Sequence, residues 1–478
     1  MEGADADMQQ AYKYFMRPDP NQRQFVGPIQ TGWDEVTGRK MRWRDARIGM
    51  LRNTAEENLK PMRVYLDPLP HVRLEAAKQL QGWYQAKQTE ENSTHRPRPC
   101  YTDAMLTSPY QGYCTVGCAF CYVNSGMRGY RGSGLVSVPM NYGEQVAGML
   151  SKLKTSAAGY FSSFTDPFLP LESYYHNTQN GAMAFVEEGL PVFFLSRLKY
   201  PDWAVELLQM NKYSYAQKSI NCPDPELWAK LSPGAMPLND HMKDIKRLKK
   251  AGIYVSIQCN PIVPGVVNHK DVVRLFEKLS NVGADHVIIK FVEAGYSWAD
   301  TMASRIEQRF GPEKGGRFRE LFTQNIGGQR TIQEEYRLEG HEIYSKAAKR
   351  VGLTYATCYE YKYARDEQGE IINKVGVSIG ADYLSADQCH GHRVPMFTRD
   401  MLEERFREVK ECPPSGCLTC GDEQPAGVGP CGSELFSAAK ALKMSDFKHG
   451  VYEQGDPGPV RMRVDPDTLV QIKVGRKK

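Results

Sequence analysis

Between about residues 142 and 291 the chain alternates segments with helical hydrophobic spacing and short apolar runs typical of strands. Five helix–strand pairs are predicted: 142–154 with 158–163, 178–188 with 191–196, 201–210 with 213–221, 240–251 with 253–261, and 270–282 with 284–291. Such alternation argues for a parallel sheet with crossover helices. Right-handed crossovers would curl the sheet into a full or partial barrel.

The two flanks of this alternation have different patterns. Residues 1–100 are polar and Pro-rich in places, so we expect an irregular extension wrapped on the main domain. A helix is predicted there at about 72–87, because Leu74, Ala77, Leu80 and Tyr84 recur at helical spacing. The expected regions are the extension at 1–100, a barrel at 101–300, a helix (334–350) and a strand (353–357) within 301–355 that complete it, and a C-terminal region at 356–478.

Polar residues follow the predicted strands, at the barrel end where active sites of this architecture lie. The candidates are Ser162, Ser163, Thr165, Asp166, Ser196, Ser219, Asn221, Gln258 and Asn260, and Arg197, Lys290 and Glu293 occupy similar places. Each of these residues could equally be an ordinary polar loop or cap position.

Composition narrows the class of protein. With 41% hydrophobic and 24% charged residues, the chain is typical of soluble globular proteins. No apolar run approaches the roughly 20 residues of a membrane helix, and the N-terminus lacks an apolar signal core. We therefore expect a cytoplasmic protein without a membrane partner. The net charge of +5 is too mild to identify a nucleic-acid partner.

The twelve cysteines change the picture, because their short spacings without a secretion signal favour metal ligation over disulfides. Cys114, Cys118 and Cys121 are separated by three and then two residues. Thiolates suit zinc or iron–sulfur clusters, and such clusters normally take four Cys ligands. Three thiolates would leave one iron open to a small molecule. A zinc site would need a fourth ligand near by, but the next Cys or His downstream is His176.

This spacing, with Phe120 just before the third cysteine, resembles the motif of the radical SAM enzymes. The resemblance implies a partial (β/α)6 barrel with the cluster loop after the first strand, a [4Fe-4S] cluster and S-adenosylmethionine. In that family one electron cleaves S-adenosylmethionine to a 5′-deoxyadenosyl radical, which implies an electron donor such as flavodoxin or ferredoxin. The candidate residues at the strand ends would then meet the cofactor's ammonium, carboxylate, ribose and adenine groups.

A second set of segments is similar to the spore photoproduct lyase-like, or DNA repair photolyase-like, branch of this family. The segments are FTDPFLPLE at 164–172, SIN at 219–221, DPEL at 224–227, SPGA at 232–235 and PIVPG at 261–265. Spore photoproduct lyases use a cysteine hydrogen-atom donor soon after the cluster motif, but no Cys lies between Cys121 and Cys222 here. Thymine-dimer repair is therefore doubtful. Cys222 and Cys259 are weak catalytic candidates, with a buried core thiol as the alternative for each.

Six further cysteines predict a second metal centre in the C-terminal region. Its first-choice ligands are Cys358, Cys389, Cys417 and Cys420, with Cys412 and Cys431 in reserve. An iron–sulfur cluster and a structural zinc ion are both consistent with these spacings. The resemblance favours the cluster, since some radical SAM proteins carry a Cys-rich extension that binds one.

A basic stretch near the N-terminus suits phosphate neutralisation and base stacking. Arg39, Lys40, Arg42, Arg44, Arg47 and Arg52 surround Trp43, with Trp33 upstream. A charged face packed on the body is an equal alternative. Together with the branch resemblance, the stretch leads us to expect a radical SAM enzyme that modifies or rearranges a DNA base or its substituent. The alternatives are a peptide or small-metabolite substrate and, from another class, a non-catalytic metal-dependent nucleic-acid-binding protein.

Overall fold

The computed structural model describes most of the chain between residues 23 and 408. The described residues are 23–49, 58–74, 104–121, 134–151, 153, 155–162, 164–326, 328–358, 360–386, 390–392, 394–395, 397–399 and 401–408, with the short strands β22 (Val451–Glu453), β23 (Arg461–Val464) and β24 (Gln471–Lys473). Arg52, Ser163 and the cysteines at 389, 412, 417, 420 and 431 lie outside them.

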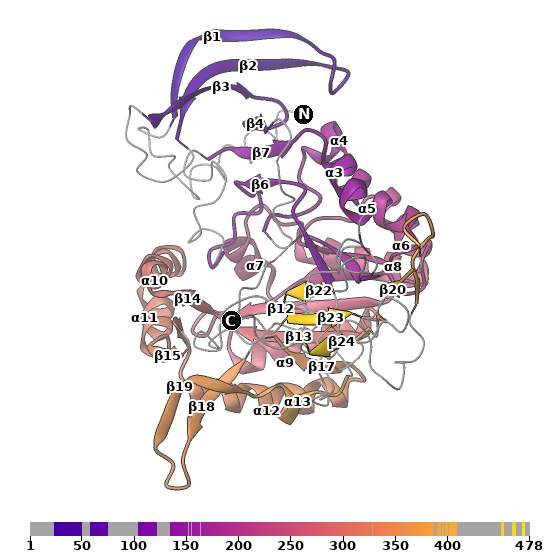
Figure 1. Cartoon of the computed structure of the whole chain (residues 1–478). Coiled ribbons are helices and arrows are strands. Elements are labelled where there is room, and N and C mark those ends of the chain that lie inside the picture. The colour runs from indigo at the N-terminus through magenta and orange to yellow at the C-terminus, as the bar shows by residue number, and fades with distance from the viewer. Residues whose placement is uncertain are drawn as a thin grey trace.

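A seven-stranded parallel half-barrel sheet forms the centre of the molecule, in the order β17-β13-β12-β11-β10-β9-β5 (Figure 1). Its strands are β5 (Ala104–Thr107), β9 (Ala158–Phe161), β10 (Val192–Ser196), β11 (Tyr215–Ser219), β12 (Val255–Ile262), β13 (His286–Phe291) and β17 (Thr354–Thr357). The predicted parallel sheet is confirmed. The strand predicted at 353–357 to complete the barrel is β17, which pairs with β13 and makes a seventh strand, where the resemblance implied six.

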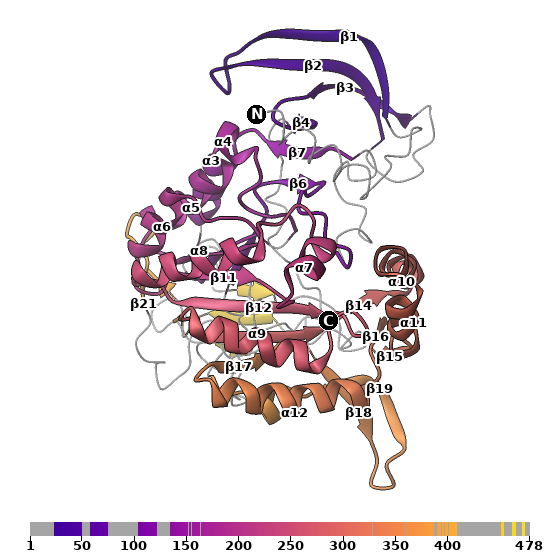
Figure 2. The same ribbon diagram turned by 180° about the vertical axis from the view of Figure 1, so that it is seen from behind.

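Amphipathic helices cover one face of this sheet, which we call the outer face. They are α5 (Asn177–Glu187), α6 (Asp202–Gln209), α8 (Leu238–Lys250), α9 (His269–Asn281) and α12 (Glu334–Arg350), and Figure 2 shows α9 and α12 side by side. All five were predicted. Alternate residues of β12, Val255, Ile257 and Cys259, belong to the core between sheet and helices. Their neighbours Ser256 and Gln258 therefore lie on the opposite, inner face.

A second sheet of six strands, which we call the N-terminal sheet, lies above the half-barrel in the view of Figure 1. Its order is β1 (Arg23–Asp34), β2 (Arg39–Ile48), β3 (Lys60–Tyr65), β4 (His71–Leu74), β7 (Val136–Pro139) and β6 (Gln111–Gly112). The expectation of an irregular extension is wrong for these residues. The predicted helix is wrong at its start, because Val72 lies in β4, paired with β7, and residues 75–87 lie outside the described part.

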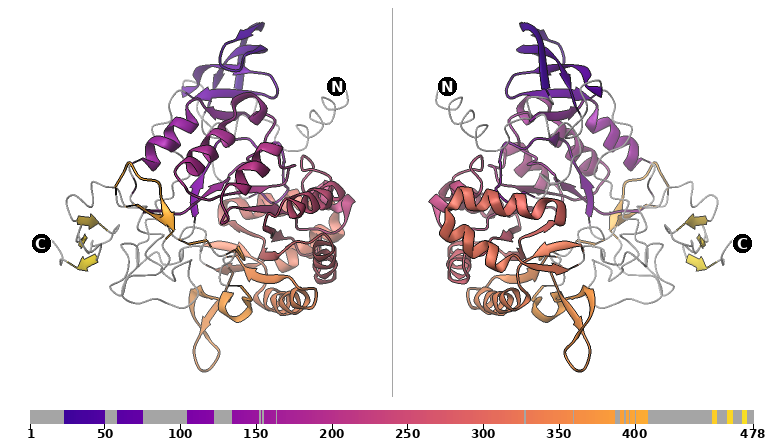
Figure 3. Two further views of the ribbon diagram at one scale, coloured as in Figure 1. Left: turned by 90° about the vertical axis from the view of Figure 1, so that its right-hand side faces the viewer. Right: turned by 90° about the vertical axis from the view of Figure 1, so that its left-hand side faces the viewer.

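Shorter elements complete the described fold. They are α3 (Tyr142–Leu150), β8 (Thr155–Ser156), α4 (Glu172–Tyr175), α7 (Pro225–Leu231), β14 (Glu293–Gly295), α10 (Tyr296–Phe310), α11 (Pro312–Leu321), β15 (Gln324–Ile326), β16 (Gln329–Thr331), β18 (Tyr361–Arg365), β19 (Ile371–Ser378), α13 (Gly380–Tyr383), β20 (Phe397–Thr398) and β21 (Arg407–Glu408). The β18–β19 hairpin projects from the body in both views of Figure 3. Within the described ranges, no helix has the length and apolar character needed to cross a bilayer.

Candidate active site

The three closely spaced cysteines lie on a loop that begins directly after β6, a few residues beyond the carboxyl end of β5, so the loop follows the first strand of the half-barrel as the resemblance implied. Cys114, Cys118 and Cys121 are all partly exposed. Gly117 adopts a φ of +63°, a conformation that glycine tolerates best. The loop folds back on itself, since the Cys121 amide donates to the Cys118 carbonyl at 3.2 Å.

The connection between α7 and α8 holds this cysteine loop in place. The Ala119 amide donates to the Leu231 carbonyl at 2.9 Å, and the Gly234 amide donates to the Val116 carbonyl at 3.0 Å. A Cβ atom at Gly234 would lie only 2.0 Å from the carbonyl oxygen of Thr115. No side chain larger than hydrogen fits there while both backbones keep their positions.

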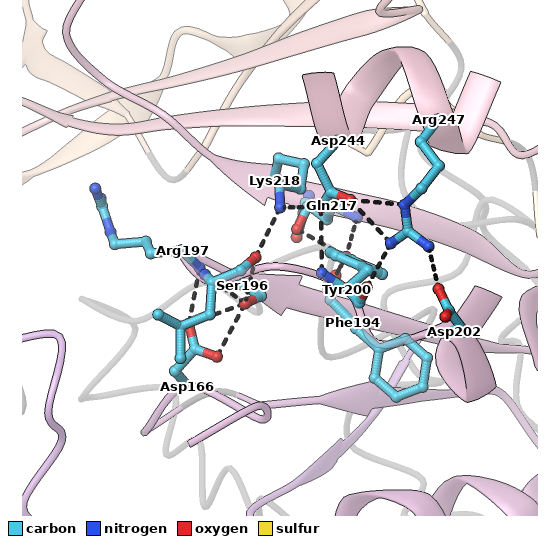
Figure 4. A network of polar contacts seen from close by, with 11 residues as sticks. Asp166, Phe194, Ser196, Arg197, Tyr200, Asp202, Gln217, Lys218, Asp244 and Arg247 are labelled. Carbon is cyan, nitrogen blue, oxygen red and sulfur yellow. Dashed lines mark hydrogen bonds and ion pairs between the residues drawn. The ribbon is translucent and has the colours of Figure 1, made fainter. Parts of the chain in front are cut away.

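Asp166 anchors the carboxyl end of β10 beside the loop. Its carboxylate accepts hydrogen bonds from the Ser196 hydroxyl (2.9 Å) and the Arg197 amide (2.7 Å) (Figure 4). It also accepts one from the Phe168 amide (3.0 Å). Burial raises the pKa of Asp166, and these hydrogen bonds oppose that effect. The position of Asp166 at a strand end predicted contact with a cofactor, whereas in the structure its carboxylate oxygens accept hydrogen bonds from the protein itself.

The side chain of Arg197 lies between the cysteine loop and the strand ends. It donates to the Ser232 hydroxyl at 3.2 Å and the Asn260 carbonyl at 3.2 Å, and its guanidinium lies 5.1 Å from the centre of the Phe120 ring. The residue is 7% exposed, yet among the described residues it forms no ion pair with a carboxylate. A buried cation without a carboxylate favours a bound anion near by.

The sequence did not predict that Arg197 contacts Ser232, or that Ser232 contacts Cys118. Arg197 was noted at a strand end but was not placed among the cofactor candidates, and Ser232 entered only as part of a resemblance. The available signal was the position of Arg197, directly after the last residue of a buried strand. No comparable local signal marked Ser232.

The other predicted residues lie at the same end of the sheet. Ser162 is buried, and its hydroxyl has no hydrogen-bond partner in the described part. The Thr165 hydroxyl donates to the Tyr110 carbonyl (2.8 Å), and the Ser219 hydroxyl donates to the Gln258 carbonyl (3.4 Å). The Asn221 amide donates to the Pro261 carbonyl (2.6 Å), and the Asn260 amide contacts Cys358 Sγ (3.9 Å). Hydrogen bonds thus link Asn221 and Asn260 to Arg197. Thr165 and Ser219 make separate local contacts.

A second polar network supports β11 from the outer face (Figure 4). The ammonium group of Lys218 is fully buried and lies 2.8 Å from Asp244 of α8. Burial tends to raise the pKa of Asp244, but the charge of Lys218 overcomes this and holds that pKa below its usual value. This pair fixes the helix on the strand and lies on the side away from the cysteine loop.

Cys222 and Cys259 both lie in the core with no exposed surface. Burial raises the pKa of the Cys222 thiol to about 12, and its Sγ contacts the Asp224 carbonyl at 3.6 Å. Burial likewise raises the pKa of Cys259. These surroundings are those of structural core thiols.

The described cysteine of the predicted second centre, Cys358, follows the carboxyl end of β17. The other five proposed ligands, Cys389, Cys412, Cys417, Cys420 and Cys431, lie outside the described residues, so the second centre stays a prediction. In the described ranges, no three His, Cys, Asp or Glu side chains surround a single metal position.

Comparison with known proteins settles the family. No family model matches the chain. The "Radical SAM Nalpha-GlyT isomerase" of Pseudomonas phage M6 is 59% identical over 446 residues, which span 92% of this chain and 92% of that protein. The chain belongs to the radical SAM enzymes.

Solved structures of radical SAM enzymes are similar at much lower identity. A spore photoproduct lyase mutant shares 14% identity at a TM-score of 0.40, covering 52% of this chain and 74% of its own. A radical SAM methyltransferase from Sphaerobacter thermophilus shares 12% identity at a TM-score of 0.36, covering 76% and 81%. These values are too low to assign any residue of this chain a role.

The residues of the cysteine loop fit the [4Fe-4S] cluster and S-adenosylmethionine that the radical SAM family uses. Cys114, Cys118 and Cys121 offer three partly exposed thiols on one loop, and a hydroxyl and a buried guanidinium accompany them. When bound, the cluster supplies the electron that cleaves S-adenosylmethionine to a carbon radical. The three thiolates would hold the cluster, Arg197 would face an anionic group of the cofactor, and the packed barrel would exclude water.

Proposed function

We propose that this radical SAM enzyme isomerises a thymine nucleotide that carries a glycine substituent attached through its α-nitrogen. The support is the name of the phage M6 relative, which is 59% identical over 92% of both chains. Read as chemistry, "Nalpha-GlyT" names a glycine joined through its α-nitrogen to T, and we take T as thymine because phage DNA offers that base. The proposal keeps the predicted rearrangement of a base substituent and names the substituent.

An isomerisation determines what must happen to the hydrogen atom that the enzyme removes. Substrate and product contain the same atoms, so a hydrogen atom removed from the substituent must be returned before the product leaves. No external hydrogen donor is consumed. This balance agrees with the burial of Cys222 and Cys259 in the core, since the reaction needs no thiol donor from the protein.

A DNA strand and an electron donor such as flavodoxin or ferredoxin are the partners that this function requires. The N-terminal sheet offers DNA less free charge than the sequence suggested, because Arg42 pairs with Asp67 at 2.5 Å and Arg44 donates to the Gly27 carbonyl at 2.6 Å. Trp33 is 70% exposed and lies opposite Lys40 in the β1–β2 pairing. An exposed indole beside a lysine suits base stacking next to a phosphate.

Anaerobic turnover tests the proposal. The reconstituted enzyme, with S-adenosylmethionine and a one-electron reductant, would be incubated with an oligonucleotide that contains Nα-glycinyl thymine. We expect a nucleoside product of unchanged mass and altered retention by liquid chromatography and mass spectrometry, and no such product with Cys118→Ala. Cofactor cleavage without any isomeric nucleoside would refute the substrate. Conversion of a glycine-containing peptide instead would restore the peptide alternative.

A further inference from the structure

The inner face of the half-barrel sheet is built in rows. A row of stacked rings crosses β9, β10 and β11 at the level of the amino ends of β10 and β11. The ring centres of Tyr160 and Phe193 are 4.6 Å apart, and those of Phe193 and Tyr215 are 4.5 Å apart. The ring of His390 lies against this row, where it contacts the Tyr215 hydroxyl. These aromatic rings form an apolar layer next to the polar groups that follow along the same strands.

Polar side chains lie next to this apolar layer. Gln217 of β11 is paired with Ser256 of β12, and one pleat higher Ser219 is paired with Gln258. Side chains alternate along a strand, so Tyr215, Gln217 and Ser219 share one face. Gln217 is 1% exposed and Ser256 is fully buried.

Three polar atoms of these rows are unsatisfied. The Gln217 Nε2, Ser256 Oγ and Gln258 Oε1 atoms are buried, and none has a hydrogen-bond partner among the described residues. Buried polar atoms in native proteins are nearly always paired, since an unpaired one costs on the order of 1–3 kcal/mol. Three unpaired atoms on two adjacent strands, below the cysteine loop, therefore point to a ligand that pairs with them.

We propose that Gln217 and Gln258 bind the imide edge of the thymine base, an inference that rests on the proposed function. That edge carries one N–H donor at N3 between two carbonyl acceptors, and the two amides offer a complementary acceptor and donor. Gln258 Oε1 accepts the N3 hydrogen, and Gln217 Nε2 donates to the neighbouring carbonyl. Both amides are neutral, which suits a neutral base and leaves no buried charge when the site is empty.

This orientation also places the reacting substituent. We place the glycine on the C5 methyl carbon, the exocyclic carbon of thymine. With the imide edge toward the aromatic rings, the C5 side of the base faces the carboxyl ends of the strands. The cysteine loop and Arg197 lie at that end. The glycine carboxylate of the substrate would then approach the end of the barrel that carries a buried cation.

The test combines a change in the base with a change in the protein. Wild-type enzyme should convert the substrate at least about tenfold better in kcat/KM than its N3-methyl analogue, because methylation removes the hydrogen-bond donor. Gln258→Met, which is similar in shape but lacks the amide, should reduce this discrimination to about twofold or less. Gln209→Met provides the control, since Gln209 lies on α6 and donates to the exposed Ala251 carbonyl. Retained discrimination in Gln258→Met would overturn the proposal.

Stability and binding give readouts that do not depend on turnover. Removing an unpaired buried amide should leave the melting temperature of the ligand-free protein unchanged or raised, whereas a structural amide would lower it on replacement. Binding of thymidine monophosphate, measured by calorimetry, should weaken at least about tenfold in Gln217→Met. If the wild type binds this nucleotide but converts no glycine adduct, the proposed function falls and the base site stands. If it does not bind the nucleotide, the base site is refuted.

Discussion

The hydroxyl of Ser232 donates to Sγ of Cys118 across 3.3 Å, although 114 residues separate the two in the sequence. Arg197 holds that hydroxyl from the other side at 3.2 Å. A hydrogen bond to a cluster thiolate withdraws electron density and raises the reduction potential. The contact therefore connects the α7–α8 connection to the ease with which an electron enters the cluster.

Replacing Ser232 by Ala should lower the midpoint potential of the reconstituted cluster by roughly 20–60 mV, where about 59 mV corresponds to a tenfold change in a one-electron equilibrium. A redox titration followed by electron paramagnetic resonance measures this directly. Ser214→Ala is the matched control, because Ser214 is also buried and hydrogen-bonded but precedes the amino end of β11. Equal potentials in wild type and Ser232→Ala would show that the hydroxyl only packs.

Gly234→Ala should reduce the amount of cluster that the protein retains. Its Cβ would meet the Thr115 carbonyl at 2.0 Å, so the cysteine loop would have to move away from the α7–α8 connection. Iron and sulfide analysis after anaerobic reconstitution should find less than about half the wild-type content, against about four irons per cubane. Gly316→Ala is the control, since nothing lies within 4 Å of a Cβ there.

Replacing Cys114, Cys118 and Cys121 together by Ala should abolish formation of 5′-deoxyadenosine. The triple variant also tests the second centre, because about four irons per protein should remain if an independent iron–sulfur cluster is bound. Zinc in place of iron would favour a structural zinc site. Absence of both metals would remove the second centre, and continued production of 5′-deoxyadenosine would contradict the role of the three thiols.

The ion pair between Asp34 and Arg73 should make the N-terminal sheet sensitive to acid. Burial alone would raise the pKa of Asp34, but two hydrogen bonds from Arg73 (2.7 and 2.6 Å) hold it at about 2. A lowered pKa means that the pair stabilises the fold fully above about pH 4 and loses this effect as the pH falls through 2. The difference from the ordinary value of 3.8 corresponds to about 2 kcal/mol.

Asp34→Asn should therefore cost about 2 kcal/mol at pH 7, and the loss should shrink as the wild type is acidified. Hydrogen exchange of the β1 and β2 amides between pH 7 and pH 3 measures the local stability. The control is Asp45→Asn, whose exposed partner Arg63 lies 3.8 Å away, and we expect a change within about 0.5 kcal/mol. A pH-independent effect of Asp34→Asn would mean that the carboxylate charge contributes nothing.

DNA binding, if it uses the N-terminal sheet, should depend more on Trp33 than on the arginines of β2. Trp33→Ala should weaken binding of single-stranded DNA with little change in salt dependence, because stacking releases no counterions. Arg42→Gln should leave the salt slope nearly unchanged, since Asp67 already neutralises that charge. Fluorescence anisotropy over a salt series measures both. A slope reduced by roughly 0.7–0.9 in Arg42→Gln would restore the arginine as a phosphate contact.

The sequence predicted those parts of the fold whose contacts are local. Helices such as α9 carry an apolar stripe and a capping box between Asn268 and Asp271, so their pattern alone identifies them. The N-terminal sheet escaped prediction because β1 exposes apolar residues, with Val26 53% and Ile29 56% exposed, and lacks a clear alternation. Val72 belongs to a strand because it pairs with Ser137, a partner that no local pattern reveals.

In the candidate active site, too, the sequence predicted the features that depend on local spacing and missed the contacts between distant segments. Three cysteines within eight residues predict a cluster from their spacing alone. The hydrogen bond from Arg197 to Ser232, in contrast, joins the end of β10 to the residue that follows α7, 35 positions later in the sequence. Asp166 was recognised as a strand-end carboxylate, but only the fold shows that its oxygens are occupied by Ser196 and the Arg197 amide. The spacing of the cysteines along the chain identifies the cluster ligands, whereas the topology of the barrel determines which residues contact them.

Arg399 links the end of the described chain to the beginning of the half-barrel. Its buried guanidinium donates to the carbonyls of Leu150 (2.6 Å) and Leu153 (2.8 Å) and pairs with Glu188 at 2.9 Å, and the adjoining Phe397 pairs with β8. The ribosome synthesises Arg399 246 residues after Leu153. The first helix–strand units of the barrel must therefore wait for the guanidinium that joins these carbonyls to the Glu188 carboxylate until nearly the whole catalytic domain has been translated. Folding of this enzyme is completed from its last-made segment back to its first, so a nascent chain stalled before Arg399 would be a ready substrate for chaperones and proteases.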